Sequence, residues 1–287
     1  MKHHHRTPLA IVAACLCCLV LTGVSSAGPI KDSGSVKDTG SDGQGTQPAS
    51  NPGVRLNTLE FGGGYNYDGS NNWDGPYVRG NLRLNGNTDS SIEVARAGAF
   101  DASGILFIGG LNRYFSKTWS ASFGFATSAG GYFLPAFSTD GSVRKRWLKN
   151  RRLETSVGFG FDRYKDQHNS YSWPFSVSYA LTPRWRVEGG VSFGYSNADA
   201  AMSRVQSAAV SYSRDKKYSI SVRGELGSQP YGIIQGDVGV SNYATHGISL
   251  RWRQWLRPNF GFKLGAGYNY SPYFQSKGAE LGFFKDF

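Results

Sequence analysis

The chain has 287 residues, of which 31 are Lys or Arg and 20 are Asp or Glu, so its formal net charge is +11 with neutral histidines. It contains 38 glycines and 41 aromatic residues (18 Phe, 16 Tyr and 7 Trp). Glycine and aromatic residues are poor helix formers, so this composition disfavours a helical bundle. The three cysteines lie together at Cys15, Cys17 and Cys18, which excludes a disulfide scaffold in the rest of the chain.

Residues 1–27 have the features of a secretory signal peptide. Lys2 and Arg6 precede an apolar run over 9–21, and small residues follow before position 28. The run is shorter than the ~20 residues that a spanning helix needs. A lipoprotein signal is the alternative, because small residues also precede Cys15. Cleavage would remove the N-terminal histidine run, so this run does not indicate a metal site.

Residues 28–54 have a different composition, rich in Gly and Ser, with no aromatic residue. Such a segment cannot bury enough apolar surface to offset the entropy of ordering, so it is predicted to be a flexible periplasmic tail. From Arg55 onward apolar and polar residues alternate, as in Leu59, Phe61, Tyr65 and Tyr67. This period of two indicates strands with one apolar face, and it predicts a single β domain over 55–287.

The spacing of the turn signals predicts how these strands are connected. Four tight turns are centred near residues 117, 150, 183 and 216, which are 33 residues apart. Two more tight turns are predicted at 86–89 and 257–259. They alternate with looser segments at 68–76, 101–104, 130–137, 165–170, 196–201, 229–244 and 272–276. Thirteen connections give an all-β meander of fourteen strands, within a range of about twelve to sixteen.

The chemistry of the two strand faces distinguishes a membrane barrel from a soluble sandwich. One face is bulky, with aromatic residues concentrated at the strand ends, and the other is mostly Gly and Ser. This arrangement is typical of a transmembrane antiparallel up-and-down β-barrel, with lipid outside and a polar lumen. The last strand ends on Phe287, which resembles the terminal assembly signal of Gram-negative outer-membrane barrels. The expected partners are therefore outer-membrane lipid, lipopolysaccharide and the barrel-assembly machinery.

Three stretches carry a resemblance to a known family. They are GGGYNYDGSNNW near residue 62, RKRWLKNRRLETSVGFGFDRYKD from Arg144, and RQWLRPNFGFKLGAGYNY from Arg253. In the order and the residue types of these stretches, the chain resembles the YaiO-like family of outer-membrane β-barrels. The resemblance implies an integral outer-membrane barrel with no assigned enzymatic activity, in a family often associated with exopolysaccharide functions. The Gly- and Ser-rich tail departs from it.

Charged residues recur on the face opposite the apolar one. Glu60 and Glu280 belong to this set, and pairs such as Arg186 and Glu188 are two residues apart, so both members face the same side. One hypothesis is an arginine-rich constriction that favours anionic solutes or sugar acids. The alternative is that the charges pair across strands and only stiffen the wall. The candidates for lining the lumen are Arg79, Arg83, Arg144, Arg146, Arg152, Glu154, Arg186, Glu188, Arg223, Glu225, Arg251, Arg253 and Lys263.

Several aromatic residues flank the predicted tight turns: Tyr77, Trp147, Trp185, Trp252 and Trp255. We expect them to anchor the barrel at the membrane interface, with stacking on a sugar as the alternative. The candidates for contact with a glycan or a phage lie in or near the predicted outer loops, and they are Trp73, Tyr132 and Tyr231.

The sequence therefore predicts a porin-like conduit for a polar or anionic solute in the cell outer membrane, with a role in exopolysaccharide export suggested by the family resemblance. A non-conducting structural or surface-receptor barrel is the alternative. A hydrolase would use His168 with Asp162 or Asp166 beside a loop serine, but no nucleophile motif supports it. No cofactor or metal is expected, and no nucleic-acid partner either, because the positive charge forms no single patch.

Overall fold

The structure is a computed structural model that describes residues 57–67, 72–99, 102–148, 150–165, 168–197, 201–230, 242–271 and 275–287. These residues form strands and short connections. No helix among them is long and apolar enough to cross a membrane. The strands are β1 (Thr58–Tyr67), β2 (Asn72–Asn85), β3 (Thr88–Ala99), β4 (Ala102–Tyr114), β5 (Trp119–Gly130), β6 (Pro135–Trp147), β7 (Leu153–Tyr164), β8 (Asn169–Ala180), β9 (Trp185–Ser196), β10 (Ala201–Arg214), β11 (Tyr218–Pro230), β12 (Asn242–Arg257), β13 (Phe260–Tyr270) and β14 (Gln275–Asp286).

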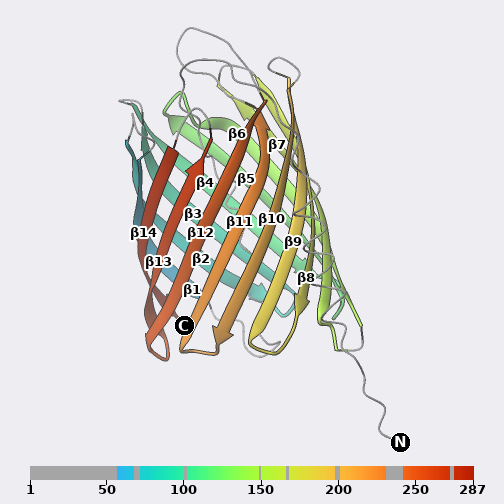
Figure 1. Cartoon of the computed structure of the whole chain (residues 1–287). Coiled ribbons are helices and arrows are strands. Elements are labelled where there is room, and N and C mark those ends of the chain that lie inside the picture. Colours follow the sequence, from blue (N-terminus) through green and yellow to red (C-terminus); the bar gives the residue numbers. More distant parts are fainter. Residues whose placement is uncertain are drawn as a thin grey trace, which may run out of the picture. The chain divides into compact units, whose positions relative to one another are not determined.

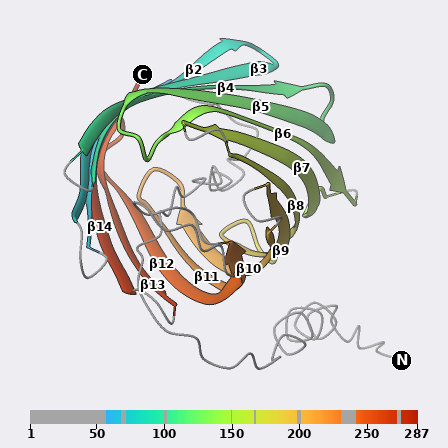
Figure 2. The same ribbon diagram turned by 90° about the horizontal axis from the view of Figure 1, so that it is seen from above.

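The strands form one closed antiparallel barrel, in which each strand pairs with its neighbours in the chain (Figures 1 and 2). The first and last strands close it, and their register runs from Thr58 opposite Asp286 to Tyr67 opposite Lys277. This pairing is antiparallel because the number of strands is even. The predicted fold and the predicted count of fourteen strands are confirmed.

Contrary to the prediction from the turn spacing, the connections do not alternate strictly between short and long. Those at one end of the barrel have two to five residues, and those at the other have two to four, apart from the eleven residues between β11 and β12. Six short connections, from 86–87 to 258–259, join β2 to β3 and then every second pair of strands as far as β12 and β13. We call this end of the barrel the tight-turn end. The other seven connections include the long segment between β11 and β12, and we call that end the wide-loop end. The barrel begins at Thr58 and closes at Asp286, both at the tight-turn end.

The two faces of the wall differ as the alternation predicts. Large apolar side chains such as Phe61, Phe123 and Val177 are about half exposed. Within a strand, exposed side chains of this kind recur at every second residue. Among the described residues only five apolar side chains are buried, namely Phe133, Leu134, Pro135, Ala209 and Phe284. The apolar surface of the barrel therefore faces outward, where it suits lipid, and the interior has almost no apolar core.

The connection between β5 and β6 is the main exception to this pattern. Phe133 and Leu134 are buried, and they pack against Ala97 and Ala102 on the inner wall of β3 and β4. Figure 2 shows this connection turning inward from the wall. Leu134 fits there because β4 has Gly104 at the contact, where an added Cβ would lie 2.7 Å from Leu134 Cδ1. An apolar loop thus occupies part of the barrel interior near the wide-loop end.

Arginine substitutions at neighbouring positions test this assignment of faces. Phe175 is on the exposed apolar face near the middle of β8, and Ser176 is on the opposite face. We expect Phe175→Arg to lower the free energy of unfolding in lipid vesicles by about 2–4 kcal/mol, because it places a charge in hydrocarbon. Ser176→Arg should cost much less. Denaturant titrations of the two variants measure this, and equal losses would contradict the assigned faces.

Candidate functional site

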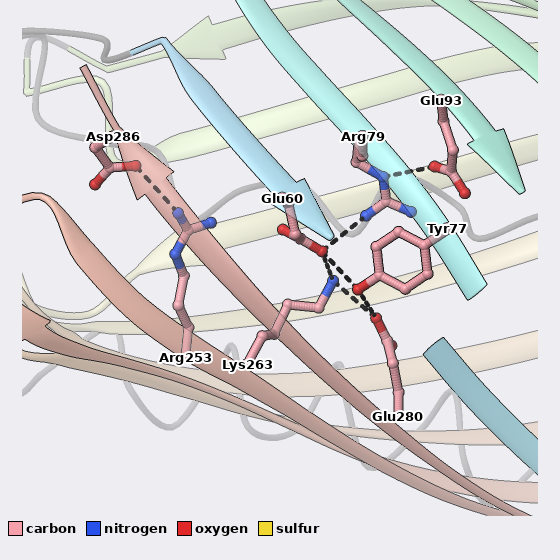
Figure 3. Close-up of polar contacts among 8 residues, drawn as sticks. All are labelled: Glu60, Tyr77, Arg79, Glu93, Arg253, Lys263, Glu280 and Asp286. Carbon is pink, nitrogen blue, oxygen red and sulfur yellow. Dashed lines mark hydrogen bonds and ion pairs between the residues drawn. The ribbon is translucent and has the colours of Figure 1, made fainter. Parts of the chain in front are cut away.

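A group of inward-facing polar residues crosses the line where the barrel closes (Figure 3). Lys263 Nζ lies 2.7 Å from Glu60 Oε1 and 3.0 Å from Glu280 Oε1. The hydroxyl of Tyr77 lies 2.8 Å from Glu60 Oε1 and 2.7 Å from Glu280 Oε1. One ammonium group and one phenol therefore hold two carboxylates together. With Arg79 and Glu93, these residues are called the seam cluster below.

The seam cluster continues along the wall into the next strands. Arg79 Nε donates to Glu93 Oε2 over 2.6 Å, and its Nη1 lies 3.8 Å from Glu60 Oε1. Its members come from the consecutive strands β13, β14, β1, β2 and β3. The side chain of Glu60 is almost fully buried. A buried carboxylate is stable only when it is paired and hydrogen-bonded, so each partner is needed to keep this charge in place.

Glycines on the inner wall make room for the Tyr77 side chain. Gly62 in β1 and Gly282 in β14 lie beside it, and an added Cβ at either would come within 2.7 Å of the Tyr77 hydroxyl. A side chain at these positions would push the phenol away from the two carboxylates. The position of the Tyr77 hydroxyl therefore depends on these two glycines as well as on the charged residues of the cluster.

A second inward group lies nearer the tight-turn end. Asp286 accepts hydrogen bonds from Thr58 Oγ1 over 2.9 Å and from Trp255 Nε1 over 2.9 Å. Arg253 Nη2 lies 3.3 Å from the same carboxylate, and its guanidinium lies 3.7 Å from the centre of the Phe284 ring. Phe284 is only 1% exposed. These contacts tie the last strand to β1 and β12 just below the seam cluster.

Charged residues also form a ladder on the wall from β6 to β11. Arg146 Nε donates to Glu154 over 2.8 Å at one end of it. Arg223 lies 2.7 Å from Glu188 and 3.7 Å from Glu225 at the other. Arg186 lies between these pairs and donates to Ser178 Oγ over 3.2 Å. Most members of the ladder are therefore neutralised by a partner on the wall.

Two arginines on this wall have no carboxylate at ion-pair distance in the described part of the chain, namely Arg144 in β6 and Arg186 in β9. Arg144 is two residues from Arg146 in β6, and Arg186 is two residues from Glu188 in β9, so both face the interior as these neighbours do. Arg144 acts electrostatically on Asp140 over a longer distance, and Arg186 on Glu154 and Glu188. These two guanidinium groups are therefore the ones most able to attract an anion inside the barrel.

Small hydroxyl side chains line much of the remaining inner wall. Ser122 and Ser142 lie 2.7 Å apart across β5 and β6. Most inward positions of β8 are also serines, and inward positions of the neighbouring strand β9 include Gly190, Ser192 and Gly194. Hydroxyl and backbone groups of this kind replace water around a polar solute without binding it tightly.

The residues of the hydrolase hypothesis do not lie in the order of a nucleophile and its base. Ser138 Oγ donates to Asp162 Oδ1, so the serine contacts the carboxylate. The His168 ring stacks on Tyr164 with their centroids 4.1 Å apart. A nucleophilic serine needs the histidine at its hydroxyl. Asp166 lies outside the described residues, and no group of three potential metal ligands occurs among those described.

The inward loop is fastened by a lysine from the next wide connection. Lys165 Nζ donates to the carbonyl oxygen of Gly130 and, over 3.1 Å, to that of Gly131. Both glycines have positive φ, 70° and 46°, which a residue with a side chain would adopt only at a cost. Loss of hydration lowers the pKa of the Lys165 ammonium group from its usual value.

Other predicted residues lie at the edges of the barrel. Arg83 bonds to the carbonyl oxygens of Asn85 and Gly86 in the first tight turn, and Arg152 is exposed in the connection after β6. Arg251 is exposed within β12. Phe287 is 62% exposed, and its amide donates to the carbonyl of Asn57. Tyr132 is 53% exposed. Tyr231 and the side chain of Trp73 lie outside the described residues.

Two of the expected interface anchors face the interior, and that part of the prediction is wrong. Tyr77 belongs to the seam cluster, and Trp255 donates to Asp286. Tyr77 has the phase of Arg79, two residues away, so it shares its inward direction. Trp255 likewise has the phase of Arg253, and the bulge between Trp255 and Arg257 shifts the register only beyond that point. Trp147, Trp185 and Trp252 are on the exposed outer face.

Three residues with structural roles in these groups escaped the sequence reasoning: Glu93, Asp286 and Phe284. Glu93 is at an inward-facing position of β3, directly opposite Arg79. The pairing register of β2 and β3 would have identified it as the partner of Arg79. Phe284 was hidden because it adjoins outward-facing Phe283 in an aromatic run. Its inward phase, which it shares with Glu280 in the same strand, was the signal that could have indicated its burial.

Comparison with known proteins agrees with the fold. A family model described as the YaiO membrane beta barrel domain matches residues 57–232. No curated protein matches the chain. Among solved structures, the CymD monoaromatic hydrocarbon channel is 8% identical, with a TM-score of 0.60, 88% of this chain covered and 94% of that chain. A bacterial polysaccharide outer membrane secretin is 13% identical, with a TM-score of 0.49 and coverage of 81% and 98%.

An anion-selective porin from Comamonas acidovorans is 9% identical, with a TM-score of 0.45 and coverage of 81% and 98%. At such low identity, the similarity to the hydrocarbon channel shows the fold alone, which is that of an outer-membrane β-barrel. The family model spans more than half of the 287 residues. The chain therefore belongs to the family of the YaiO membrane beta barrel domain.

Proposed function

We propose that the protein is a channel that conducts a small polar solute across the outer membrane, with a preference for anions. One observation carries the proposal: a barrel of fourteen strands has only five buried apolar side chains among its described residues. Barrels of about eight strands can be filled by their own side chains, whereas those of sixteen or more leave an aqueous channel. A wide wall lined with serine, glycine and paired charges favours water in the interior.

Arg144 and Arg186 support the preference for anions. The other charges of the ladder are largely compensated by partners on the wall, so these two arginines contribute positive potential to the interior. A guanidinium group that is not engaged by a carboxylate can pair with carboxylate, phosphate or sulfate groups of a passing solute. A sugar acid has such a group together with hydroxyls that match the serines.

Reversal potentials in planar bilayers test this selectivity. We expect the full-length protein to conduct and to favour chloride over potassium in a salt gradient. The double substitution Arg144→Gln and Arg186→Gln should move the permeability ratio toward one, because it removes the uncompensated charge. The matched control, Arg96→Gln with Lys277→Gln, changes exposed residues of the apolar face and should leave the ratio unchanged. A cation preference in the unaltered protein would contradict the proposal.

A non-conducting structural or receptor barrel is the second candidate, and the inward loop favours it. Phe133 and Leu134 occupy part of the interior, and Lys165 fastens their connection. If the loop only narrows the passage, Phe133→Ser with Leu134→Ser should raise single-channel conductance. Tyr132→Ser in the same connection is the control, since that side chain is exposed and should change conductance little. Absence of current in all three proteins would support the closed barrel.

Export of an acidic exopolysaccharide is a narrower form of the proposal, suggested by the family's association with exopolysaccharides. We propose further that a signal peptide is cleaved, that Phe287 is part of the assembly signal, and that the barrel has no enzymatic activity. Current block by an acidic oligosaccharide, absent with its neutral counterpart, would support the export role. Hydrolysis of ester or peptide substrates that His168→Ala abolishes would contradict the last point.

A further inference from the structure

Basic residues are concentrated at the tight-turn end of the barrel. The described residues of its six connections include six basic residues and one acidic residue, Asp215. The described residues of the seven wide-loop connections include one lysine, Lys165, and no carboxylate. The basic set of the tight-turn connections is Lys117, Arg151, Arg152, Arg184, Lys216 and Lys217.

The cations of the tight-turn end are distributed around the whole barrel. The ends of the adjoining strands add further exposed arginines and one lysine, so each of the six turns has at least one exposed cation in it or beside it. We call this set the basic rim: Arg83, Arg113, Lys117, Arg151, Arg152, Arg184, Arg214, Lys216, Lys217, Arg257 and Lys285.

The basic rim is not neutralised within the described part of the protein. None of its members forms a salt bridge with a described carboxylate. Their side-chain hydrogen bonds in the described part go to neutral oxygens. Arg113 donates to Thr88 Oγ1 over 2.6 Å, and Lys216 donates to the carbonyl oxygen of Pro258 over 3.2 Å. This contrasts with the inner wall, where most cations have carboxylate partners. The uncompensated charge is therefore available to an external anion.

The position of the rim relative to aromatic side chains indicates which anion. Lys145, on the outer face of β6, lies 4.6 Å from the Trp119 ring centre and 4.1 Å from that of Trp147. Exposed tryptophans at strand ends mark the membrane interface, where lipid headgroups lie. The cations thus lie at the height of lipid phosphates, around the full circumference. A compact acidic protein would instead require a patch on one side.

We propose that the basic rim binds the anionic headgroups of phospholipids in the leaflet next to the tight turns. Basic residues near an anionic membrane surface are attracted to it electrostatically, and the attraction weakens with salt. Short turns of outer-membrane barrels lie on the periplasmic side, so the leaflet is the periplasmic one. This role does not depend on whether the lumen conducts.

Quenching of tryptophan fluorescence by brominated lipid measures the association at this end. Trp119, Trp147, Trp185 and Trp252 are exposed on the outer face in the half of the barrel next to the tight turns, so their quenching reports on the rim. The full-length protein is refolded into phosphatidylcholine vesicles that contain either brominated phosphatidylglycerol or brominated phosphatidylcholine. We expect phosphatidylglycerol to associate at least about threefold more strongly at low salt, and the difference to disappear at high salt.

A matched pair of variants locates the effect. The rim variant combines Lys117→Gln, Arg184→Gln, Lys217→Gln and Arg257→Gln, all at exposed positions, and it should lose most of the preference for phosphatidylglycerol. The control combines Arg96→Gln, Arg163→Gln, Arg204→Gln and Lys277→Gln, which are exposed near the wide-loop end, and it should keep the preference. Equal association of the two lipids with the unaltered protein, or equal losses in both variants, would overturn the proposal. If the rim variant does not fold, the salt dependence of the unaltered protein decides.

Discussion

The structure depends on satisfying every backbone hydrogen bond in a solvent that offers none. Lipid cannot bond to the free edge of a sheet, so the sheet has to close on itself. Here closure requires β1 to pair with β14, two strands that are more than two hundred residues apart in the chain. The seam cluster lies across this pairing and joins β13 to β3 through side chains. The contact that is entropically most expensive to form is therefore also the one with the densest polar reinforcement.

The same closure explains why the interior has charges where a soluble protein has an apolar core. Most of the large apolar side chains lie on the outer face, so few of them are left for the interior. Charges on such a wall are acceptable when each has a partner, because breaking a buried pair costs more than the pair itself contributes. Glu60 illustrates this, since it is nearly inaccessible and is shared between Lys263, Tyr77 and Arg79. The inner wall is thus a network whose members cannot be removed one at a time without cost.

Much of the fold could be predicted because strand alternation and turn chemistry are local. The positions of the tight turns follow from the residues that favour turns. The inward direction of Arg146, Arg186 and Arg223 follows from the period of two along each strand. Alternation determines the side of the sheet but not the cross-strand neighbour, so Glu93 escaped notice as the partner of Arg79. Aromatic residues near the tight turns were expected to anchor the barrel in the membrane, and this was wrong for Tyr77 and Trp255. Alternation along the strand, not closeness to a turn, decides whether a side chain faces lipid or the interior. The burial of Phe133 and Leu134 depends on a remote glycine, Gly104, which no local pattern indicates.

The inward connection between β5 and β6 also makes the interior asymmetric. It packs on the inner surface of β3 and β4, at Ala97 and Ala102. The serines of β8 and the arginines of the charged ladder lie on other strands of the wall. A molecule that passes this level would therefore meet apolar side chains on one side of the interior and hydroxyl and guanidinium groups on another.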